Sequence, residues 1–334
     1  MRKTYYLFNP GRLSRKDNTL KFVATDEDGN QQPAKYIPIE GISDLYVFGA
    51  LDANAALYNF LGKNQIAVHF FDYYENYSGS FMPREYLLAG QMVISQSRHY
   101  LNKHKRLQLA QKLVEGASFN MLKNLQYYDR RKQDLQTEIN TIESLRGQIA
   151  ATKTVSELMG IEGNIRQLYY QGFNDILKDF EMPGRSKRPP MDEINALISF
   201  GNMMCYSSCL RNIYHTQLNP TISFLHEPGT RRYSLALDLA EIFKPILVDR
   251  VIFKVINKKM IREKDFDAQL NRCLLKENGK KTFIRAYEER LNETIQHRTL
   301  KKKVSYGHLI KLECFKLGKH VLDIQEYKPF KIWW

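Results

Sequence analysis

A helix predicted over residues 234–252 carries two carboxylates, Asp238 and Glu241, although nearly all of its other positions are apolar. A helix that is apolar on most sides is buried. Residues three, four and seven apart stack along a helix, so Asp238 and Glu241 share one face, with Asp249 farther along the same stripe. Two carboxylates about 5–6 Å apart repel by roughly 3 kcal/mol at an effective dielectric near 20. We therefore expect a positive group between Asp238 and Glu241, because desolvation adds to that cost.

A third acid, Glu162, lies on the apolar stripe of a helix predicted within residues 156–180. Gly160 and Gly163 flank it, and each glycine costs a helix about 1 kcal/mol relative to alanine. Their presence predicts that another backbone, or a ligand, comes close to this helix. The alternative is that Glu162 is only neutralised by Arg166, one turn farther along.

His226 precedes a turn that leads into the helix of Asp238 and Glu241. A lone histidine before a turn is usually a packing residue, but Glu162, His226 and Glu241 together would supply one neutral nitrogen and two anionic oxygens. This donor set suits Mg²⁺ or Mn²⁺ bound to phosphate and water better than a closed zinc site. Pro245 removes the helix hydrogen bond that would reach the carbonyl of Glu241, so we expect the helix to kink or restart there.

Basic residues surround these candidate ligands and favour a phosphate substrate, since arginine matches phosphate with two donors and lysine supplies a point charge. The residues predicted to bind DNA are Arg166, Arg231, Arg232, Lys244 and Arg250. The net charge of the chain is +14, and residues 250–334 hold 21 Lys and Arg against 10 Asp and Glu, a net of +11. Such a concentrated positive field indicates a polyanionic partner, or else a solvated face kept for solubility. The run Lys301–Lys303 is predicted to follow the phosphate backbone without reading sequence.

The totals are those of a soluble protein of 334 residues with 43% hydrophobic residues. No apolar run approaches the roughly 20 residues of a membrane span, and the N-terminus has no apolar core of signal-peptide length. The four cysteines are expected to be reduced, buried thiols of a cytoplasmic protein rather than zinc ligands or disulfides. They are Cys205, Cys209, Cys273 and Cys314.

The predicted fold class is α+β, with a β-rich domain over residues 1–85 and a larger all-helical domain over residues 86–334. Short aromatic and β-branched stretches separated by turn residues indicate strands up to about residue 85, interrupted by one helix. After Pro83, helical periodicity predicts two or three long helices and then further helices to about residue 325. The aromatic and basic end of the chain, residues 326–334, could dock on the body or stay loose.

Three stretches, in this order, also resemble a known family: "MGIEGNIRQLYY", "RSKRPPMDEINALISFG" and "LNPTISFLHEPGTRRYSLALDLAEIFKPILVDR". They are similar to the CRISPR-associated adaptation integrases, metal-dependent DNases that insert spacers, and the resemblance runs over most of the chain. By position it implies that Glu162, His226 and Glu241 are divalent-metal ligands and that Asp238 is an accessory acid. Many members have Asp where this chain has Glu241, and the form around it looks most like the I-B subtype.

The resemblance also implies a reaction and an assembly. The 3′-OH of a protospacer strand would attack a phosphodiester at the leader–repeat junction of a CRISPR array, and water in place of the hydroxyl would give endonuclease activity. The partners implied are double-stranded DNA, a second copy paired through the β-rich domain, and a small ferredoxin-like adaptation protein that completes a heterohexamer.

Two other functions fit some of the same residues. A non-catalytic nucleic-acid-binding scaffold would explain the charge but would leave Glu162 and Asp238 buried for no purpose. A small-molecule metallohydrolase would explain the ligands but not the basic C-terminal part. A steep loss of affinity with added salt would separate DNA from a small substrate.

Overall fold

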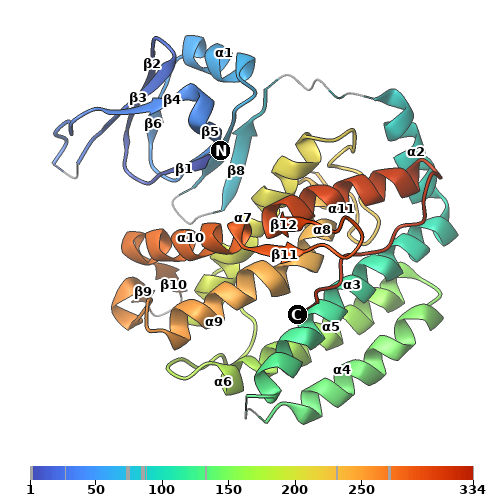
Figure 1. The fold of residues 1–334 in the computed structure, drawn as a ribbon. Helices are drawn as coiled ribbons and strands as arrows, with labels where there is room; N and C mark the ends of the chain where they lie inside the picture. Colours follow the sequence, from blue (N-terminus) through green and yellow to red (C-terminus); the bar gives the residue numbers. More distant parts are fainter. Residues whose placement is uncertain are drawn as a thin grey trace. The chain divides into compact units, whose positions relative to one another are not determined.

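The chain divides into two compact units, Met1–Leu88 and Ala89–Trp334, in a computed structural model (Figure 1). The structure describes residues 3–26, 28–72, 76–83, 87, 89–131, 134–230, 232–269 and 272–333. The first unit is rich in strands and the second is mainly helical. The predicted α+β fold class is therefore confirmed.

The described residues of the first unit form two four-stranded sheets, one α-helix and a short 3₁₀ turn. Strands β1, β5 and β7 are parallel and β8 is antiparallel to β7, in the order β1-β5-β7-β8. The second sheet has the order β4-β3-β2-β6, with only β2 and β6 parallel. The elements are β1 (Lys3–Leu7), β2 (Gly11–Lys16), β3 (Thr19–Ala24), β4 (Lys35–Pro38), the 3₁₀ turn η1 (Ile39–Gly41), β5 (Ile42–Val47), β6 (Leu51–Asp52), α1 (Ala55–Lys63), β7 (Ala67–Phe71) and β8 (Tyr77–Phe81).

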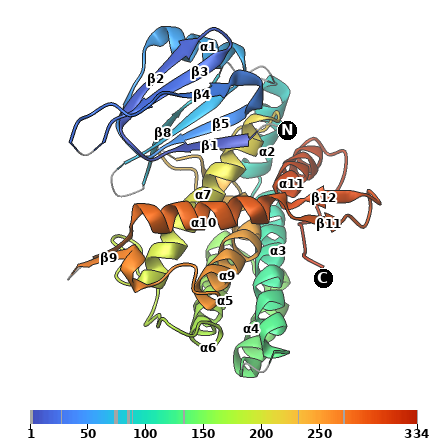
Figure 2. The same ribbon diagram turned by 60° about the vertical axis from the view of Figure 1, so that its left-hand side comes forward.

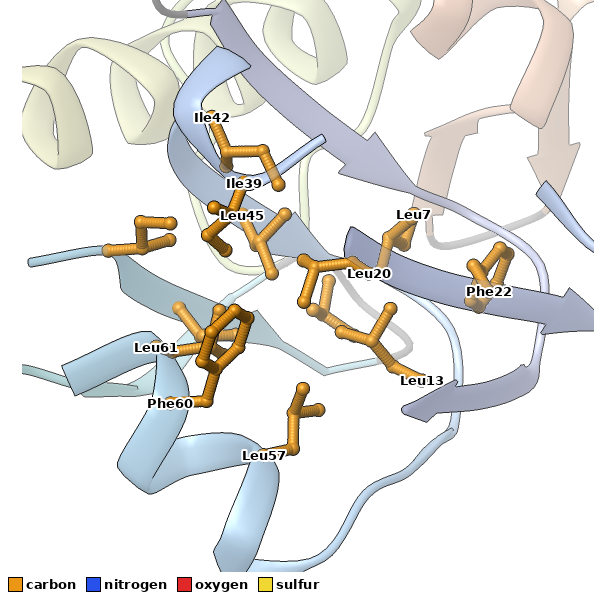
Figure 3. Close-up of a cluster of buried hydrophobic side chains, with 13 residues drawn as sticks. Leu7, Leu13, Leu20, Phe22, Ile39, Ile42, Leu45, Leu57, Phe60 and Leu61 are labelled. Carbon is orange, nitrogen blue, oxygen red and sulfur yellow. The ribbon is translucent and has the colours of Figure 1, made fainter. Parts of the chain in front are cut away.

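The core of the first unit lies between its sheets and α1. Alternating strand residues such as Leu13 and Leu20 are buried because successive side chains of a strand point to opposite faces. Figure 3 shows them gathered with Leu57 and Leu61 of the helix. The helix begins after Asn54, whose side chain accepts the backbone N–H of Leu57 at 3.0 Å, a common N-terminal cap.

The second unit is a packed set of helices, as its apolar periodicity predicts. Its elements are α2 (Gly90–Leu101), α3 (Lys103–Asp129), α4 (Gln136–Gln148), η2 (Ile149–Ala151), α5 (Val155–Gln171), α6 (Phe173–Ile176), α7 (Glu193–Tyr214), α8 (Ser234–Lys244), η3 (Pro245–Asp249), α9 (Arg250–Asn257), η4 (Glu263–Asp265), β9 (Phe266–Gln269), β10 (Arg272–Leu275), α10 (Glu277–Asn292), β11 (Thr294–Gln296), β12 (Lys303–Ser305) and α11 (Tyr306–Val321).

Helix α3 is the long central support of this unit. It packs against α4, α5 and α8, and Figures 1 and 2 show it running beside α4 and α5. The three helices α2, α3 and α4 correspond to the two or three long helices predicted after Pro83. Two short antiparallel pairs, β9 with β10 and β11 with β12, were not predicted. Helices α5 and α8, which carry the candidate ligands, are thus held by a common neighbour.

The interruption predicted at Pro245 takes the form of a π-helical segment. Regular helix α8 ends at Lys244, η3 continues it over Pro245–Asp249, and α9 follows directly. Segments of this kind are rare and frequently lie at functional sites. The change of helix type therefore comes one turn after Glu241.

The end of the chain docks on the helical unit, which settles the alternative that the sequence left open. Tyr327, Phe330 and Ile332 are buried. Glu313 Oε1 accepts the Tyr327 hydroxyl at 2.6 Å and the Phe330 backbone N–H at 2.9 Å. Tyr327 and Phe330, which sequence alone could not place, are therefore part of the core.

No helix among the described parts of the chain is long and apolar enough to cross a membrane. All four cysteines are buried, as predicted, and their thiols are free.

Candidate active site

Helix α8 carries Asp238 and Glu241 into the interior, with 0% and 5% of their surfaces exposed. The helix is buried because apolar side chains cover almost every side of it. Its start is fixed by the Ser234 hydroxyl, which donates to the carbonyl of Thr221 at 2.8 Å. Both acids thus need partners within the protein, since an unpaired buried charge is expensive.

Asp238 is held by the loop that precedes its helix. Its Oδ2 accepts the backbone N–H groups of Phe224 at 2.7 Å and Leu225 at 3.0 Å. Its Oδ1 accepts the backbone N–H of His226 and lies 2.9 Å from His226 Nδ1. Four polar contacts therefore compensate this buried carboxylate, and they fix the backbone around the histidine.

Glu162 and Glu241 share a single guanidinium. Arg166 donates through Nε to Glu162 Oε1 at 2.8 Å, and its Nη2 donates to both Glu162 and Glu241. Lys244 Nζ lies 2.7 Å from the other oxygen of Glu241. Burial would raise the pKa of the Glu241 carboxyl, but Arg166, Lys244 and then His226 outweigh it and hold that pKa well below its usual range. Glu241 is therefore ionised at neutral pH.

Among the described residues no lysine or arginine bridges Asp238 to Glu241, so the positive group expected between them stays a prediction. Asp238 is compensated by backbone N–H groups and by His226, whereas Arg166 bridges Glu241 to Glu162, from a different helix. The physical reason is that both acids find their partners through tertiary contacts. His226 is the residue common to both, because its Nδ1 contacts Asp238 and it lies near enough to Glu241 to interact with that carboxyl electrostatically.

A divalent cation fits the chemistry of these donors. Two carboxylates already share one positive group, and His226, with Nδ1 on Asp238, has no partner for Nε2 among the described residues. A carboxylate that contacts the other ring nitrogen orients an imidazole for a metal. Within the described residues, however, no three His, Cys, Asp or Glu side chains are grouped as they would be around an ion. Arg166 and Lys244 hold the carboxylates instead.

The loop of His226 is anchored to the rest of the unit. Arg106 of α3 donates through Nε to the Phe224 carbonyl at 3.0 Å and pairs with Glu227 at 2.6 Å. The Tyr100 hydroxyl donates to the same carboxylate at 2.8 Å. These contacts, which sequence reasoning missed, hold the backbone on both sides of His226.

The five residues predicted to bind DNA have different surroundings. Arg166 and Lys244 pair with Glu162 and Glu241, and we call these two carboxylates the acidic cluster. Arg232 is exposed and donates to the Glu227 carbonyl at 2.6 Å. The Arg250 guanidinium lies 4.1 Å from the centre of the Tyr127 ring. Arg231 lies outside the described residues.

Two further cations near the cluster were not predicted. Lys187 lies at the surface. Partial desolvation of its ammonium group lowers its pKa, and the nearby positive charges of Arg185, Arg166 and Lys244 lower it further. Arg185 is held in place by Asn195, at 2.7 Å. The signal that could have found them is the basic composition of the loop before α7. The acidic cluster therefore has a basic rim.

The glycines beside Glu162 have open surroundings. A Cβ atom added at Gly160 or Gly163 would meet no described atom within 4 Å. A neighbouring backbone therefore does not account for them. The other explanation, that a ligand approaches this helix, remains a prediction.

Residues 5–289 match the family model for CRISPR associated protein Cas1. The chain belongs to the Cas1 family, which confirms the resemblance carried by the three sequence motifs. It is 49% identical to the CRISPR-associated protein Cas1 1 of Methanobrevibacter ruminantium, over 100% of this chain and 99% of that protein. It is 48% identical to the CRISPR-associated endonuclease Cas1 3 of Thermodesulfovibrio yellowstonii, over 99% and 100%.

Solved structures share the fold. A Cas1 protein from Thermotoga maritima superposes with a TM-score of 0.86 and 38% identity, covering 97% of this chain and 98% of that one. A casposase bound to its integration product gives 0.85 at 20% identity, covering 98% and 93%. A Cas6-RT-Cas1–Cas2 complex gives 0.81 at 19% identity, covering 100% of this chain and 36% of that one. The last two are evidence of a common fold only.

Proposed function

We propose that this protein is a divalent-metal-dependent DNA endonuclease and integrase that inserts protospacer DNA at the leader–repeat junction of a CRISPR array. One observation carries the proposal most: Glu162 and Glu241, from two different helices, share the guanidinium of Arg166 beside His226. Membership of the Cas1 family and the endonuclease names of its relatives support it.

Glu162, His226 and Glu241 would hold the ion, and Mg²⁺ or Mn²⁺ suits their oxygen and nitrogen donors. When bound, the ion polarises a phosphoryl oxygen and stabilises charge on the attacking or leaving oxygen of the DNA. Asp238 keeps the imidazole of His226 oriented, with Nε2 directed away from its own carboxylate.

The basic side chains would bind the DNA strand. Arg166 and Lys244 compensate the acids in this structure and would turn to the phosphate once the carboxylates bind a cation. Lys187 adds charge at the rim, and Arg232 and Arg250 remain predicted DNA contacts. Because both the hydroxyl of a DNA 3′ end and water can attack the same phosphorus atom, one site serves integration and cleavage.

The proposed assembly follows from the family. The strand-rich unit would pair two copies of the chain, and a small ferredoxin-like adaptation protein would join two such dimers into a heterohexamer acting in the cytoplasm. A Cas6-RT-Cas1–Cas2 complex contains a chain that shares the fold of this one. A partner of the Cas2 kind is proposed for this protein as a member of the Cas1 family.

The test is a half-site integration assay with purified protein and a supercoiled plasmid bearing a repeat, with and without Mn²⁺. We expect strand transfer only with Mn²⁺ and its loss in Glu162→Gln and His226→Ala, while both variants still bind DNA. The control is Glu138→Gln, on the neighbouring helix α4, which should keep full activity. Unchanged strand transfer in Glu162→Gln and His226→Ala would instead favour a non-catalytic scaffold.

A further inference from the structure

A buried network of hydrogen bonds links helices α3 and α5 to the segment η3. The Tyr169 hydroxyl donates to Asp249 Oδ2 at 2.9 Å. Asn124 Nδ2 donates to the Tyr169 oxygen at 2.9 Å and to the Pro245 carbonyl at 2.6 Å. All three polar side chains are at most 2% exposed. These hydrogen bonds thus connect α3 and α5 to the π-helical segment η3.

These hydrogen bonds join the same two helical segments that carry Glu162 and Glu241, namely α5 and the continuous α8 and η3. Tyr169 follows Glu162 by seven residues on α5, two turns farther along the same face, or about 10 Å. Asp249 follows Glu241 by eight residues on the continuous α8 and η3. The two helical segments are therefore linked twice, by Arg166 with Glu241 and by Tyr169 with Asp249.

The π-helical segment makes the second link possible. In a regular α-helix, a residue eight positions on lies about 80° round the axis, because a turn holds 3.6 residues. A π turn closes its hydrogen bonds one residue farther along, so it takes more residues per turn. It thereby returns Asp249 toward the face of Glu241, where Tyr169 can reach it.

The two links respond differently to a bound cation. Arg166 must share or release the oxygens of Glu162 and Glu241 when those oxygens ligate an ion. The link between Arg166 and Glu241 therefore weakens when the ion binds. Tyr169 and Asp249 ligate nothing in the proposed site, so the second link can persist in both states. We infer that Tyr169 and Asp249 are a positioning pair that sets the separation of Glu162 and Glu241 for the divalent ion. This inference rests on the proposed function.

The experiment measures Mn²⁺ affinity of the full-length protein by titration calorimetry, without DNA. Tyr169→Phe removes only the hydroxyl, and we expect it to raise the Mn²⁺ dissociation constant about 10- to 100-fold, the usual cost of losing an outer-shell partner. Tyr170→Phe is the matched control, since Tyr170 is the adjacent buried tyrosine and interacts with the charges of Asp249 and Arg166, but its hydroxyl forms no hydrogen bond with the described residues. It should change the constant by less than about twofold.

Variants at the other end of the link test the same pair. Asp249→Ala should weaken Mn²⁺ binding as Tyr169→Phe does, and the double variant should be no worse than either single one, because the two residues act as one unit. Asp249→Asn keeps an oxygen for the Tyr169 hydroxyl and should bind Mn²⁺ nearly as wild type does. If Tyr169→Phe does not fold by circular dichroism, the comparison of Asp249→Ala with Asp249→Asn carries the test.

Equal Mn²⁺ affinity in wild type, Tyr169→Phe and Asp249→Ala would overturn the positioning role. Glu162→Gln separates this result from failure of the proposed function. If Glu162→Gln binds Mn²⁺ weakly while Tyr169→Phe binds normally, only the positioning pair is refuted. If Glu162→Gln itself binds normally, the proposed ligand set is refuted.

Discussion

The Nδ1 atom of His226 lies 2.9 Å from Oδ1 of Asp238, an acid with no exposed surface. A carboxylate in this position favours the tautomer that carries its proton on Nδ1, and it leaves Nε2 as the electron-pair donor. The same carboxylate accepts three backbone N–H groups from residues 224–226. Asp238 therefore acts on the histidine through both its ring and its backbone.

Replacing Asp238 by alanine should impair both stability and activity. Three buried N–H groups would lose their acceptor, at roughly 1–3 kcal/mol for an unsatisfied group, so we expect unfolding to become easier by at least about 3 kcal/mol. Metal affinity and strand transfer should fall about 10- to 100-fold. Urea denaturation and Mn²⁺ titration measure the two effects. A variant that lost stability but kept wild-type Mn²⁺ affinity would show that Asp238 does not orient the histidine.

Replacing Arg166 by methionine should separate metal binding from turnover. Arg166 competes for the oxygens of Glu162 and Glu241, so its removal should tighten Mn²⁺ binding by about three- to tenfold. Strand transfer should nevertheless slow by about tenfold or more, because a charge that faces the phosphate is lost. Arg146→Met, a partly buried arginine of α4, is the control and should change neither. Weaker Mn²⁺ binding in Arg166→Met would contradict the competition.

Stability should depend on the ionisation of Asp249. Burial raises its pKa to about 7, although Tyr169, Arg166 and Lys244 each lower it and Glu241 raises it further. Because the unfolded chain releases this proton near pH 4, the folded state binds one proton more between about pH 4 and 7. The contribution of Asp249 to the free energy of unfolding is therefore fully present below about pH 4, and it is lost as the pH rises from there through about 7.

The Asp249→Asn variant checks this dependence, since asparagine does not titrate. From pH 5 to pH 8 the free energy of unfolding of the wild type should fall by about 2–3 kcal/mol more than that of Asp249→Asn. Urea denaturation of both proteins at the two pH values measures this difference. A difference between the two proteins that is the same at both values would mean that Asp249 ionises normally in the folded state.

Neutralising Lys301, Lys302 and Lys303 together should weaken DNA binding without changing sequence preference. All three are exposed at the end of the β11–β12 hairpin, where they can meet phosphate groups. Each lost phosphate contact should reduce the slope of log affinity against log salt by about 0.9 for duplex DNA. Fluorescence anisotropy with two unrelated duplexes over a salt series measures both quantities. A selective loss for one duplex would show that the lysines read sequence.

The division into a strand-rich and a helical part was predictable because hydrophobic periodicity is a local signal. Residues such as Leu13 and Leu20 alternate with polar ones, and α3 keeps its apolar spacing over many turns. The hairpins were missed because strands of three or four residues, such as Thr294–Gln296, are too short to show a period.

The site was predictable only in part. The shared face of Asp238 and Glu241 follows from helix geometry, and so does the pairing of Glu162 with Arg166 four residues on. The second partner of Arg166 lies 75 residues away, and the donors to Asp238 come from a loop whose path depends on tertiary contacts with Arg106. No local pattern encodes either relationship.

The most direct test of the account is a crystal of the protein soaked in Mn²⁺, with diffraction recorded where manganese scatters anomalously. We expect a Mn²⁺ peak within about 2.0–2.4 Å of a Glu162 oxygen, a Glu241 oxygen and His226 Nε2, with Arg166 moved off at least one carboxylate. Manganese bound elsewhere, with Arg166 still bridging the two acids, would contradict the proposed metal site.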